Sequence, residues 1–564
     1  MKRYIMLVSF LMVVSILAGS DGAKAQTLAV SGAGNLAVST AVTFQNLWIY
    51  KNNNATQINL AMDASGVLHA GFTAYSPTGS GKWPAYYAAC ASNCDVAANW
   101  KTAIVGDVGA FGGDVRVAVD SAGHPRLMWY DQPSVGGNGW FYYAECSSNC
   151  TNAGQWTSGQ LNGPGLSPEN SQYFTLNLSD HPRFVYKDLL SGSPTLNNLY
   201  YAFCNTDCTV ATNWTKLLLN SQYEPHNFSL VMDKSGGVHL AFRDASVNPN
   251  RLVYAECTAS CTSGSSNWAS GVLVSTLGSG EAFSLAIDSQ GQPRLALYFG
   301  YLGSAYSQNN RLSYLWCDTG CTSASNWYYY LLGFPVTYGQ DVDLAIDPQG
   351  LPHMAIYIDS TADSTYGLGY LTCTASCLTS SPTWHYQLIE TTDTLDASDP
   401  VPVASGCSNS LWMDVGPSPS IVLDANGSPI IGYDAIHYQG GSCAIHADIN
   451  LVRLAVATSS SITSTPTSTS TPTKTATATS KPTSTPTRTA TVTVTRTPTS
   501  TTTPAKTAGL TRTPTPTKTS ILAQNKIYLP LIIKGSFNAQ SVNSLNSFQG
   551  WFQGLSARFS ALLY

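Results

Sequence analysis

The sequence predicts an all-β protein: a seven-bladed β-propeller followed by a disordered Thr/Pro-rich stalk and a short C-terminal tail. Three observations support this fold class. A unit of apolar run, Asp-centred turn and second apolar run occurs seven times, a Tyr-x-x-Cys-x-x-x-Cys motif with a following Trp occurs six times, and the spacing of the units is nearly constant. Self-similarity at a fixed period indicates a repeat architecture, and short antiparallel strands in series are typical of propellers.

The N-terminal segment predicts export. Lys2 and Arg3 precede an apolar run, and AKA at 23–25 is a small-x-small cleavage signal. Residues 1–25 are therefore expected to be a signal peptide. A membrane anchor is the alternative, although the apolar run is short for a span. We expect a secreted, extracellular or cell-surface-associated protein.

The first repeated motif predicts a β-hairpin in every unit, because short runs of β-favouring residues flank turn-forming residues, as in VRVAVDSAGHPRLMWY. The turn aspartates are assigned as Asp63, Asp120, Asp180, Asp233, Asp288, Asp347 and Asp424. We expect the third copy to be shortened, with Ser179 and Asp180 replacing the longer loop. The resulting spacings are 53 to 60 residues, apart from 77 at the end.

Each unit is expected to hold four strands: one into the Asp turn, one out of it, one ending at Tyr-x-x-Cys and one beginning near the Trp. The seventh unit has no fourth strand after INLVRLAVA. The N-terminal segment VTFQNLWIY is expected to supply it, because Trp48 precedes Asp63 much as Trp100 precedes Asp120. Such closure hides the sheet edges. We assign residues 26–456 to a propeller of seven blades, with six or eight as alternatives.

The cysteines predict local disulfides, since exported thiols meet oxidising conditions and the count is even. The expected pairs are Cys90/Cys94, Cys146/Cys150, Cys204/Cys208, Cys257/Cys261, Cys317/Cys321, Cys373/Cys377 and Cys407/Cys443. Zinc would need four converging ligands, and a redox centre would favour Cys-x-x-Cys. Closing a five-residue loop removes roughly 2 kcal/mol of unfolded-chain entropy. Each pair is thus expected to hold one hairpin and to perform no chemistry.

One basic position recurs at the start of the second strand. It is occupied by His69, Arg126, Arg183, His239, Arg294 and His353, and by Ile430 in the seventh unit. A ring of cations for an anionic ligand is one interpretation. Recurrence beside the Asp turn favours the other, in which each side chain pairs with the turn aspartate.

The Asp-x-x-Gly-x-Pro units resemble the repeats of sialidase-like and other Asp-box β-propellers, and less closely NHL-type repeats. They depart from the sialidase Asp box, S-x-D-x-G-x-x-W, because the Gly stands three rather than two places after the Asp and the Trp is absent. The resemblance covers the propeller only, and it implies the fold more than any activity.

Beyond the propeller, the composition changes to Thr, Pro and Ser over residues 457–525. Such a segment cannot bury a core and is expected to be a disordered linker, open to glycosylation. Residues 526–564 form a hydrophobic or amphipathic tail. The stalk and IYLPLIIK resemble the C-terminal region of secreted proteins from filamentous Chloroflexi-type bacteria.

Charge divides along the same boundary. Residues 26–456 carry 14 Lys and Arg against 31 Asp and Glu, whereas the remainder carries ten basic residues and no acidic one. The acidic head disfavours nucleic acid as a ligand, and the basic stalk and tail are expected to lie against the cell envelope. We expect a monomer.

The loops leaving the second strands and those joining the blades are expected to share one face, and variable loops on a rigid scaffold usually bind ligands. The candidate ligand-binding residues on this loop face are Trp129, Asp131, Tyr186, Asp188, Phe242, Asp244, Asp359, Asp434, Glu224, Glu281 and Asp341. Aromatics with carboxylates suit a neutral sugar, and calcium would also accept these oxygens; no other cofactor is expected. Acids that merely cap strand ends are the structural alternative.

Three functions compete. The first is a binding module, adhesin- or lectin-like, for a neutral glycan or a protein. The second is a sialidase-like glycoside hydrolase, and the third is a structural envelope protein. A sialidase needs converging arginines, a tyrosine nucleophile and an acid. The arginines left for the loop face are chiefly Arg116, Arg243, Arg251 and Arg311. No catalytic residue is predicted, and the binding module is preferred.

Overall fold

The computed structural model describes residues 42–458 except for short stretches. The stretches left out are 52–53, 77–81, 107–110, 133–138, 162–171, 190–196, 278–281, 300–310, 333–340, 361–364, 404–406, 408 and 441–448. The chain divides into two units, Met1–Thr467 and Ser468–Tyr564. The expected signal peptide, stalk and tail lie outside the described residues.

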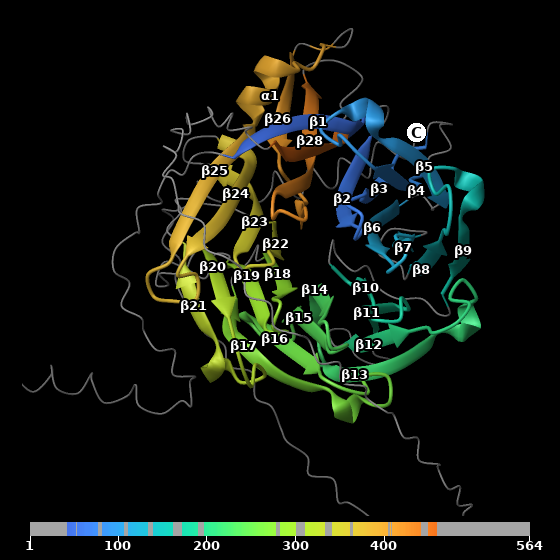
Figure 1. Cartoon of the computed structure of the whole chain (residues 1–564), viewed down its shortest axis with the longest axis vertical. Helices are drawn as coiled ribbons and strands as arrows, with labels where there is room; N and C mark the ends of the chain where they lie inside the picture. Colours follow the sequence, from blue (N-terminus) through green and yellow to red (C-terminus); the bar gives the residue numbers. More distant parts are fainter. Residues whose placement is uncertain are drawn as a thin grey trace, which may run out of the picture. The chain divides into compact units, whose positions relative to one another are not determined.

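Seven antiparallel sheets surround a central channel, as the sequence predicted (Figure 1). Blade 1 contains β2 (Ala55–Met62), β3 (Leu68–Ala74), β4 (Ala85–Cys90) and β5 (Lys101–Gly106). Blade 2 contains β6 (Phe111–Val119), β7 (Pro125–Gln132), β8 (Trp140–Glu145) and β9 (Thr157–Gln160). Blade 3 contains β10 (Phe174–Leu176), β11 (Pro182–Leu189), β12 (Asn197–Phe203) and β13 (Thr215–Tyr223). Blade 4 contains β14 (Pro225–Met232), β15 (Val238–Asp244), β16 (Asn250–Cys257) and β17 (Ala269–Leu277). Blade 5 contains β18 (Ala282–Ile287), β19 (Pro293–Phe299), β20 (Arg311–Trp316) and β21 (Tyr328–Leu331). Blade 6 contains β22 (Val342–Ile346), β23 (Pro352–Ser360), β24 (Thr365–Ala375) and β25 (Thr383–Thr391).

Blade 7 joins the two ends of the propeller. It contains β26 (Asn409–Val415), β27 (Ser420–Leu423), β28 (Pro429–Gly440), β29 (Ile449–Thr458) and, as its last strand, β1 (Thr43–Tyr50). β1 runs antiparallel to β29, with Thr43 opposite Thr458. The predicted N-terminal closure is therefore confirmed.

The sequence did not predict helix α1 (Thr392–Ser398), which lies between blades 6 and 7. Near it, Trp48 of β1 stacks on Trp412 of β26, donates a hydrogen bond from Nε1 to Asp399 Oδ2 at 2.7 Å, and faces the Arg453 guanidinium. The segment that contains α1 and Asp399 thus holds β1, the strand that closes the propeller, in place. No helix in the described part of the chain is long and apolar enough to cross a membrane.

The Asp turns have one geometry, and it corrects the assignment in blade 3. In blade 1, Asp63 Oδ1 accepts the N–H groups of Ser65 at 2.8 Å and Val67 at 2.9 Å. In blade 3 the same bonds go to Asn177, whereas Asp180 has φ 63° and takes the place of the turn glycine. The third turn is therefore not shortened. The sequence assignment favoured the aspartate, but Asn makes the same turn bonds.

The cysteine motif forms six disulfides, one within each of blades 1 to 6, as predicted: Cys90–Cys94, Cys146–Cys150, Cys204–Cys208, Cys257–Cys261, Cys317–Cys321 and Cys373–Cys377. Cys407 is also disulfide-bonded. Its expected partner, Cys443, lies outside the described residues.

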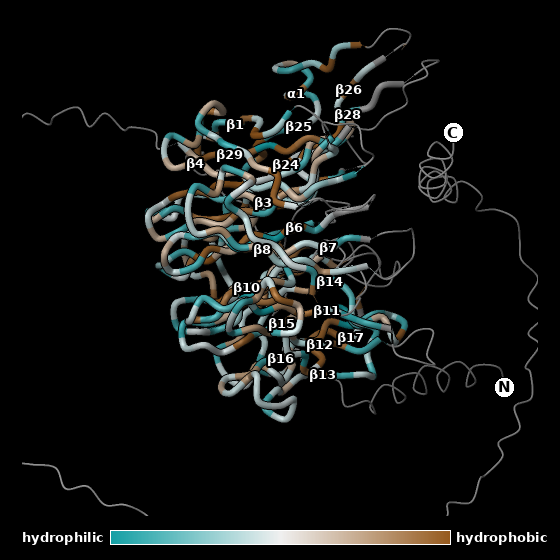
Figure 2. Tube along the Cα trace, turned by 90° about the vertical axis from the view of Figure 1, so that its right-hand side faces the viewer, coloured by the Kyte–Doolittle hydropathy of each residue, from teal (hydrophilic) through white to brown (hydrophobic). Residues whose placement is uncertain are grey.

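The Tyr and Trp of the motif connect neighbouring blades. Tyr87 of blade 1 contacts Trp156 of blade 2 edge-on, with ring centroids 5.1 Å apart. Equivalent contacts are Tyr143–Trp214, Tyr201–Trp268, Tyr254–Trp327 and Tyr314–Trp384, and Phe44 of β1 takes the Trp place against Tyr370. Apolar segments run along the strands, and hydrophilic turns border them (Figure 2).

The recurrent basic position pairs with the turn aspartate, which confirms the preferred interpretation. Arg294 Nη2 lies 2.6 Å from Asp288 Oδ2, and both side chains are buried. Similar pairs are Arg126–Asp120, His69–Asp63, His239–Asp233 and His353–Asp347. Arg183 instead donates to Asn205, because blade 3 has Asn177 in place of the turn aspartate.

Candidate ligand site in the central channel

The innermost strands begin with a strained residue at the loop-face mouth of the channel. Gln57, Asp114, Asn227 and Ser418 each stand six places before the turn residue and have φ between 45° and 62°. In blades 1, 2 and 4 the strand pairing shifts register at this point. Non-glycine residues with positive φ and β-bulges are concentrated at functional sites. The mouth therefore differs from an ordinary strand start.

Two residues at this position link blades. Gln57 Oε1 accepts the N–H of Asp114 at 2.8 Å, and Asp341 Oδ2 accepts the N–H of Ser418 at 3.0 Å. Asp341 occupies the same place, six residues before Asp347. We call these positions the upper ring, which contains Gln57, Asp114, Asn227, Ala282, Asp341 and Ser418.

Two residues further along each strand, a lower ring lies four places before the turn. Its members are Asn59, Arg116, Tyr173, Ser229, Ser284, Asp343 and Ser420. Five of them accept an N–H from the following blade at 2.9 to 3.1 Å: Asn59 from Val117, Ser229 from Leu285, Ser284 from Leu344, Asp343 from Ile421 and Ser420 from Leu60. The lower ring is thus mainly a device that ties adjacent blades.

Two neighbouring blades depart from this rule. A guanidinium has no acceptor atom, so Arg116 of blade 2 cannot accept such a bond. Tyr173 of blade 3 donates its hydroxyl to the Asp114 carbonyl at 2.6 Å. Beside it, Gln172 donates through Nε2 to Asp343 and accepts from Ser229 Oγ at 3.2 Å. The repeat pattern does not account for Arg116 and Gln172, which makes them candidate ligand contacts.

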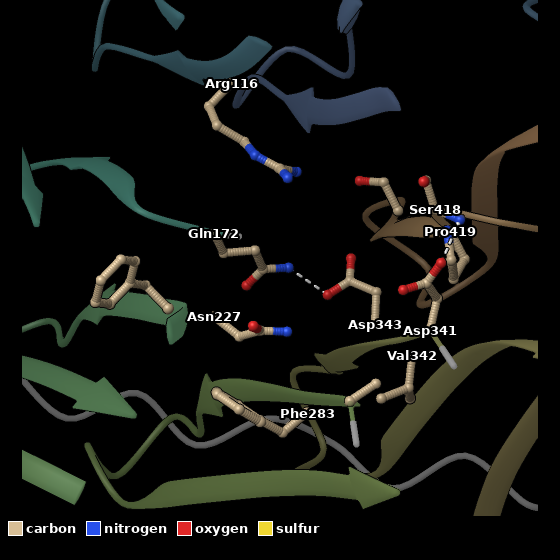
Figure 3. A pocket seen from close by; sticks show the side chains of 12 residues that line it. Arg116, Gln172, Asn227, Phe283, Asp341, Val342, Asp343, Ser418 and Pro419 are labelled. Carbon is tan, nitrogen blue, oxygen red and sulfur yellow. Dashed lines mark hydrogen bonds between the residues drawn. The ribbon is translucent and has the colours of Figure 1, made fainter. Parts of the chain in front are cut away.

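These side chains line one hollow at the mouth of the channel (Figure 3). Arg116 reaches in from one wall, and Asp341 and Asp343 project from blade 6 on another. The opening has a volume of about 60 Å³, and a wider section of the channel, of about 380 Å³, shares Arg116, Gln172, Asp343 and Ser420 with it. Its remaining lining includes Gln172, Asn227, Phe283, Ser418 and Ser420.

Burial changes the protonation of the carboxylates here. It raises the pKa of Asp341, although Arg116 and the Ser418 N–H oppose the shift. It also raises the pKa of Asp343, against hydrogen bonds from Ile421, Ser284, Leu344 and Gln172. Both groups are therefore easier to protonate than ordinary aspartates.

Asp434, at 2 % exposure, lies close enough to Asp341 for the two carboxylates to repel each other. Burial, with a smaller contribution from that repulsion, raises the pKa of Asp434 to about 7. Its carboxylate accepts from Thr56 Oγ1 at 2.5 Å and from the Gln57 N–H. It therefore joins blade 7 to blade 1 behind the mouth.

A further acidic group lies at the edge of blades 6 and 7. Burial, then the Asp414 charge, raises the pKa of Asp359 to about 6. Tyr357 donates a hydrogen bond to Asp414, and burial together with Asp414 raises the pKa of the Tyr357 hydroxyl far above its usual range. Neither Asp359 nor Asp414 lines the channel openings described above.

The aromatic residues predicted for the loop face lie inside the blades. Trp129, Tyr186 and Phe242 are 1 %, 2 % and 1 % exposed. Trp129 stacks on Tyr142, and Tyr186 lies between Phe184 and Tyr200. Alternation along β7, β11 and β15 directs these rings into the core, so they offer no free face to a ligand.

Most of the predicted acids have protein partners away from the channel. Asp244 is fully buried and pairs with Arg251 at 2.5 Å. Glu224 contacts His226 at 3.2 Å. Asp131 and Asp188 are half-buried, and their charges act on Tyr142 and Tyr200 respectively. Glu281 lies outside the described residues. Of the predicted residues that the structure describes, Asp341 alone lines the channel openings, and Asp434 lies near it.

Gln172, Asn227, Asp343 and Ser418 were not predicted from the sequence as ligand contacts, and Arg116 was predicted only as one of the arginines left for the loop face. A signal was present for two of them: Arg116 and Asp343 are charged residues inside apolar runs, each four places before a turn aspartate. Of the arginines in the described part of the chain, Arg116 alone lines the channel openings. Within the same residues, no group of three or more His, Cys, Asp or Glu is placed to hold a metal ion.

No protein-family model matches the chain, and no curated protein matches it. Three solved structures are similar in part. A Dyadobacter fermentans protein of unknown function has 10 % identity, covers 73 % of this chain and 98 % of its own, and gives a TM-score of 0.39. The Fusarium graminearum α-L-arabinofuranosidase Arb93A has 13 % identity, with 59 % and 98 % covered and a TM-score of 0.38. The Streptococcus pneumoniae sialidase NanB has 10 % identity, with 73 % and 70 % covered and a TM-score of 0.37. At this similarity no functional argument rests on them.

Proposed function

We propose that the protein is a binding propeller, adhesin- or lectin-like, that takes a glycan at the loop-face mouth of its channel. The observation that carries the proposal is the convergence of Arg116, Gln172, Asn227, Asp341 and Asp343 on one hollow. These side chains combine donors and acceptors, and sugar hydroxyls both donate and accept. Phe283 adds apolar surface, which suits the apolar face of a sugar ring.

The expected export and stalk fit this function. A stalk would hold the head away from the envelope, so that a ligand on another surface could reach the channel mouth. Six disulfides are consistent with an extracellular location.

A glycoside hydrolase is the second candidate, because two carboxyl groups with raised pKa values line the same hollow and glycoside hydrolysis uses such a pair. The sialidase version is disfavoured: holding a sialic acid carboxylate needs converging guanidinium groups, and Arg116 is the one arginine from the described residues in this hollow. A purely structural envelope protein would show neither binding nor turnover.

The test is a glycan array probed with the full chain, with and without EDTA. Binding to neutral glycans that survives EDTA is expected. Arg116→Asn should weaken it roughly 10- to 100-fold, since hydrogen bonds to charged groups contribute about 1.5–3 kcal/mol. Asn already occupies the equivalent place in blade 1, so the fold should tolerate it.

Asp207→Asn is the matched control, because Asp207 is exposed in the Cys204–Cys208 loop, outside the channel lining, and its φ of 47° suits Asn. If Arg116→Asn left the affinity unchanged, the ligand would bind outside this hollow. Release of a fluorophore from aryl glycosides, lost in Asp341→Asn, would favour the hydrolase instead.

A further inference from the structure

Blade 6 places two carboxylates where other blades use neutral side chains for the same hydrogen bond. In the lower ring, Asp343 accepts the N–H of Ile421 at 2.9 Å, and Ser229 accepts that of Leu285 at the same distance. In the upper ring, Asp341 accepts an N–H from the next blade, as Gln57 does in blade 1. The architecture therefore requires an acceptor at these positions but not a negative charge.

Burying a charge that the fold does not need is unfavourable. Asp343 is 5 % exposed. Each carboxylate oxygen can accept about two hydrogen bonds. Asp341 accepts from Ser418 through Oδ2, which leaves its Oδ1 for a ligand. Asp343 Oδ1 already accepts from Gln172, Ser284 and Leu344, whereas Asp343 Oδ2 accepts from Ile421 and has one further site. Both carboxylates line the hollow, and Asp341 offers the larger acceptor capacity.

The charge balance at the mouth is negative. Two carboxylates and one guanidinium line the hollow, Asp114 adds a buried carboxylate to the upper ring, and the Asp434 carboxyl acts on Asp341 from behind. Residues 26–456 carry 31 acidic against 14 basic residues, so the head as a whole also attracts cations. An acidic ligand would be repelled.

We propose that the wall formed by Asp341 and Asp343 binds a protonated primary amine of the ligand, while Arg116 donates to one of the ligand's oxygens. An opening of about 60 Å³ has room for an ammonium group. This inference rests on the proposed glycan-binding function and specifies it: the ligand is an amino sugar with a free amine.

The experiment measures affinities of the full chain by isothermal titration calorimetry at pH 7.5. The probes are a glucosamine trimer, its N-acetylated form, cellotriose, trigalacturonic acid and cadaverine. The glucosamine trimer is expected to bind at least tenfold more tightly than the N-acetylated trimer and cellotriose, and trigalacturonic acid is expected not to bind. Adding calcium or EDTA should leave the affinity unchanged.

The chain itself supplies conservative variants. Asp341→Gln combined with Asp343→Ser installs the residues of blades 1 and 4, which keep the bonds from Ser418 and Ile421 but give up those from Gln172 and Ser284. This variant should lose the preference for the amine and still unfold cooperatively, with a melting temperature only modestly below that of the native protein. Asp207→Asn should retain the preference.

The outcomes separate the two proposals. Neutral and amino sugars that bind equally well would overturn the amine site and keep the glycan function. Cadaverine bound through Asp341 and Asp343, with no sugar bound, would keep the amine site and overturn the glycan function. Calcium-dependent binding, preference for trigalacturonic acid, or no binding at all would overturn the amine site.

Discussion

The Asp63 turn and the channel mouth of the propeller differ in the pKa of their buried carboxylates. On the Asp-turn face, burial alone would raise the pKa of Asp63, but hydrogen bonds from Ser65 and Val67 and the nearby His69 lower it. At the channel mouth, burial dominates and raises the pKa of Asp341 and Asp343. The first arrangement stabilises the ionised form of the carboxyl group, and the second favours its protonated form.

The same two regions also differ in regularity. The turn, the basic partner and the disulfide recur almost unchanged through blades 1 to 6, so they serve the architecture. The rings at the channel mouth change from blade to blade, with Arg116, Tyr173 and Asp343 in one equivalent position. In a repeat protein, departures from the repeat are therefore the better guide to function.

The largest effect on stability is expected from Asp288→Ala on the Asp-turn face. It leaves the Arg294 guanidinium, 2 % exposed, with the half-exposed Asp318 at 3.0 Å as its remaining carboxylate partner. Removing one member of a buried pair typically costs about 3–5 kcal/mol, and Asp318 should offset part of this cost. Urea unfolding measures the change, and ligand binding by the folded fraction should persist.

Asp424→Ala is the internal control, because blade 7 has Ile430 at the recurrent basic position. It removes the turn bonds to Asn426 and Ser428, and no buried cation loses a carboxylate partner. Equal losses in the two variants would contradict the proposed importance of the pair.

Asp434→Asn tests the raised carboxyl pKa near the channel mouth. Asp434 binds a proton more tightly in the folded state, so its contribution makes stability fall as the pH rises from about 4 through about 7, by at most about 1.4 kcal/mol per pH unit. Asn cannot titrate, so the variant should show a shallower fall over this range. Thermal unfolding from pH 4 to 8 measures it.

Asp63→Asn should change the pH dependence of stability in the opposite direction. The lowered pKa of Asp63 gives stability that is present above pH 4 and is lost as the pH falls through the folded-state pKa, so this variant should flatten the acid limb. Identical pH profiles for the two variants would break the electrostatic contrast between the faces.

Replacing both Cys204 and Cys208 by Ala should cost roughly 2 kcal/mol, the entropy of a five-residue loop in the unfolded chain. Calorimetry of the full chain measures the loss. Binding at the channel should be unchanged because the disulfide does not line the hollow. A loss of binding without a loss of stability would show that this loop is not purely architectural.

The smallest stability effect is expected for Asp343→Ser, about 1–2 kcal/mol, because Ser can keep the bond to the next blade but leaves the Gln172 and Ser284 donors without this acceptor. The variant should nevertheless impair ligand binding. Melting curves and titration calorimetry on one preparation compare the two quantities. Strong destabilisation would mean that the Asp343 charge serves the fold.

The sequence by itself determined the number of blades, the N-terminal closure, the six local disulfides and the pairing of the recurrent basic residues with the turn aspartates. These features depend on contacts that are close along the chain or repeated at a fixed period, so the pattern of residues carries them. The one error in the turns, at Asp180, arose because Asn177 makes the same turn and carries no charge to mark it.

Only the tertiary structure decided which polar residues share the channel. Arg116, Gln172 and Asp343 come from blades 2, 3 and 6, and they meet because the closed ring brings every innermost strand to one axis. The burial of Trp129 and Phe242 was likewise decided by which side of each strand faces the neighbouring blade. Strand alternation gives two faces, and the packing of blades determines which face is covered.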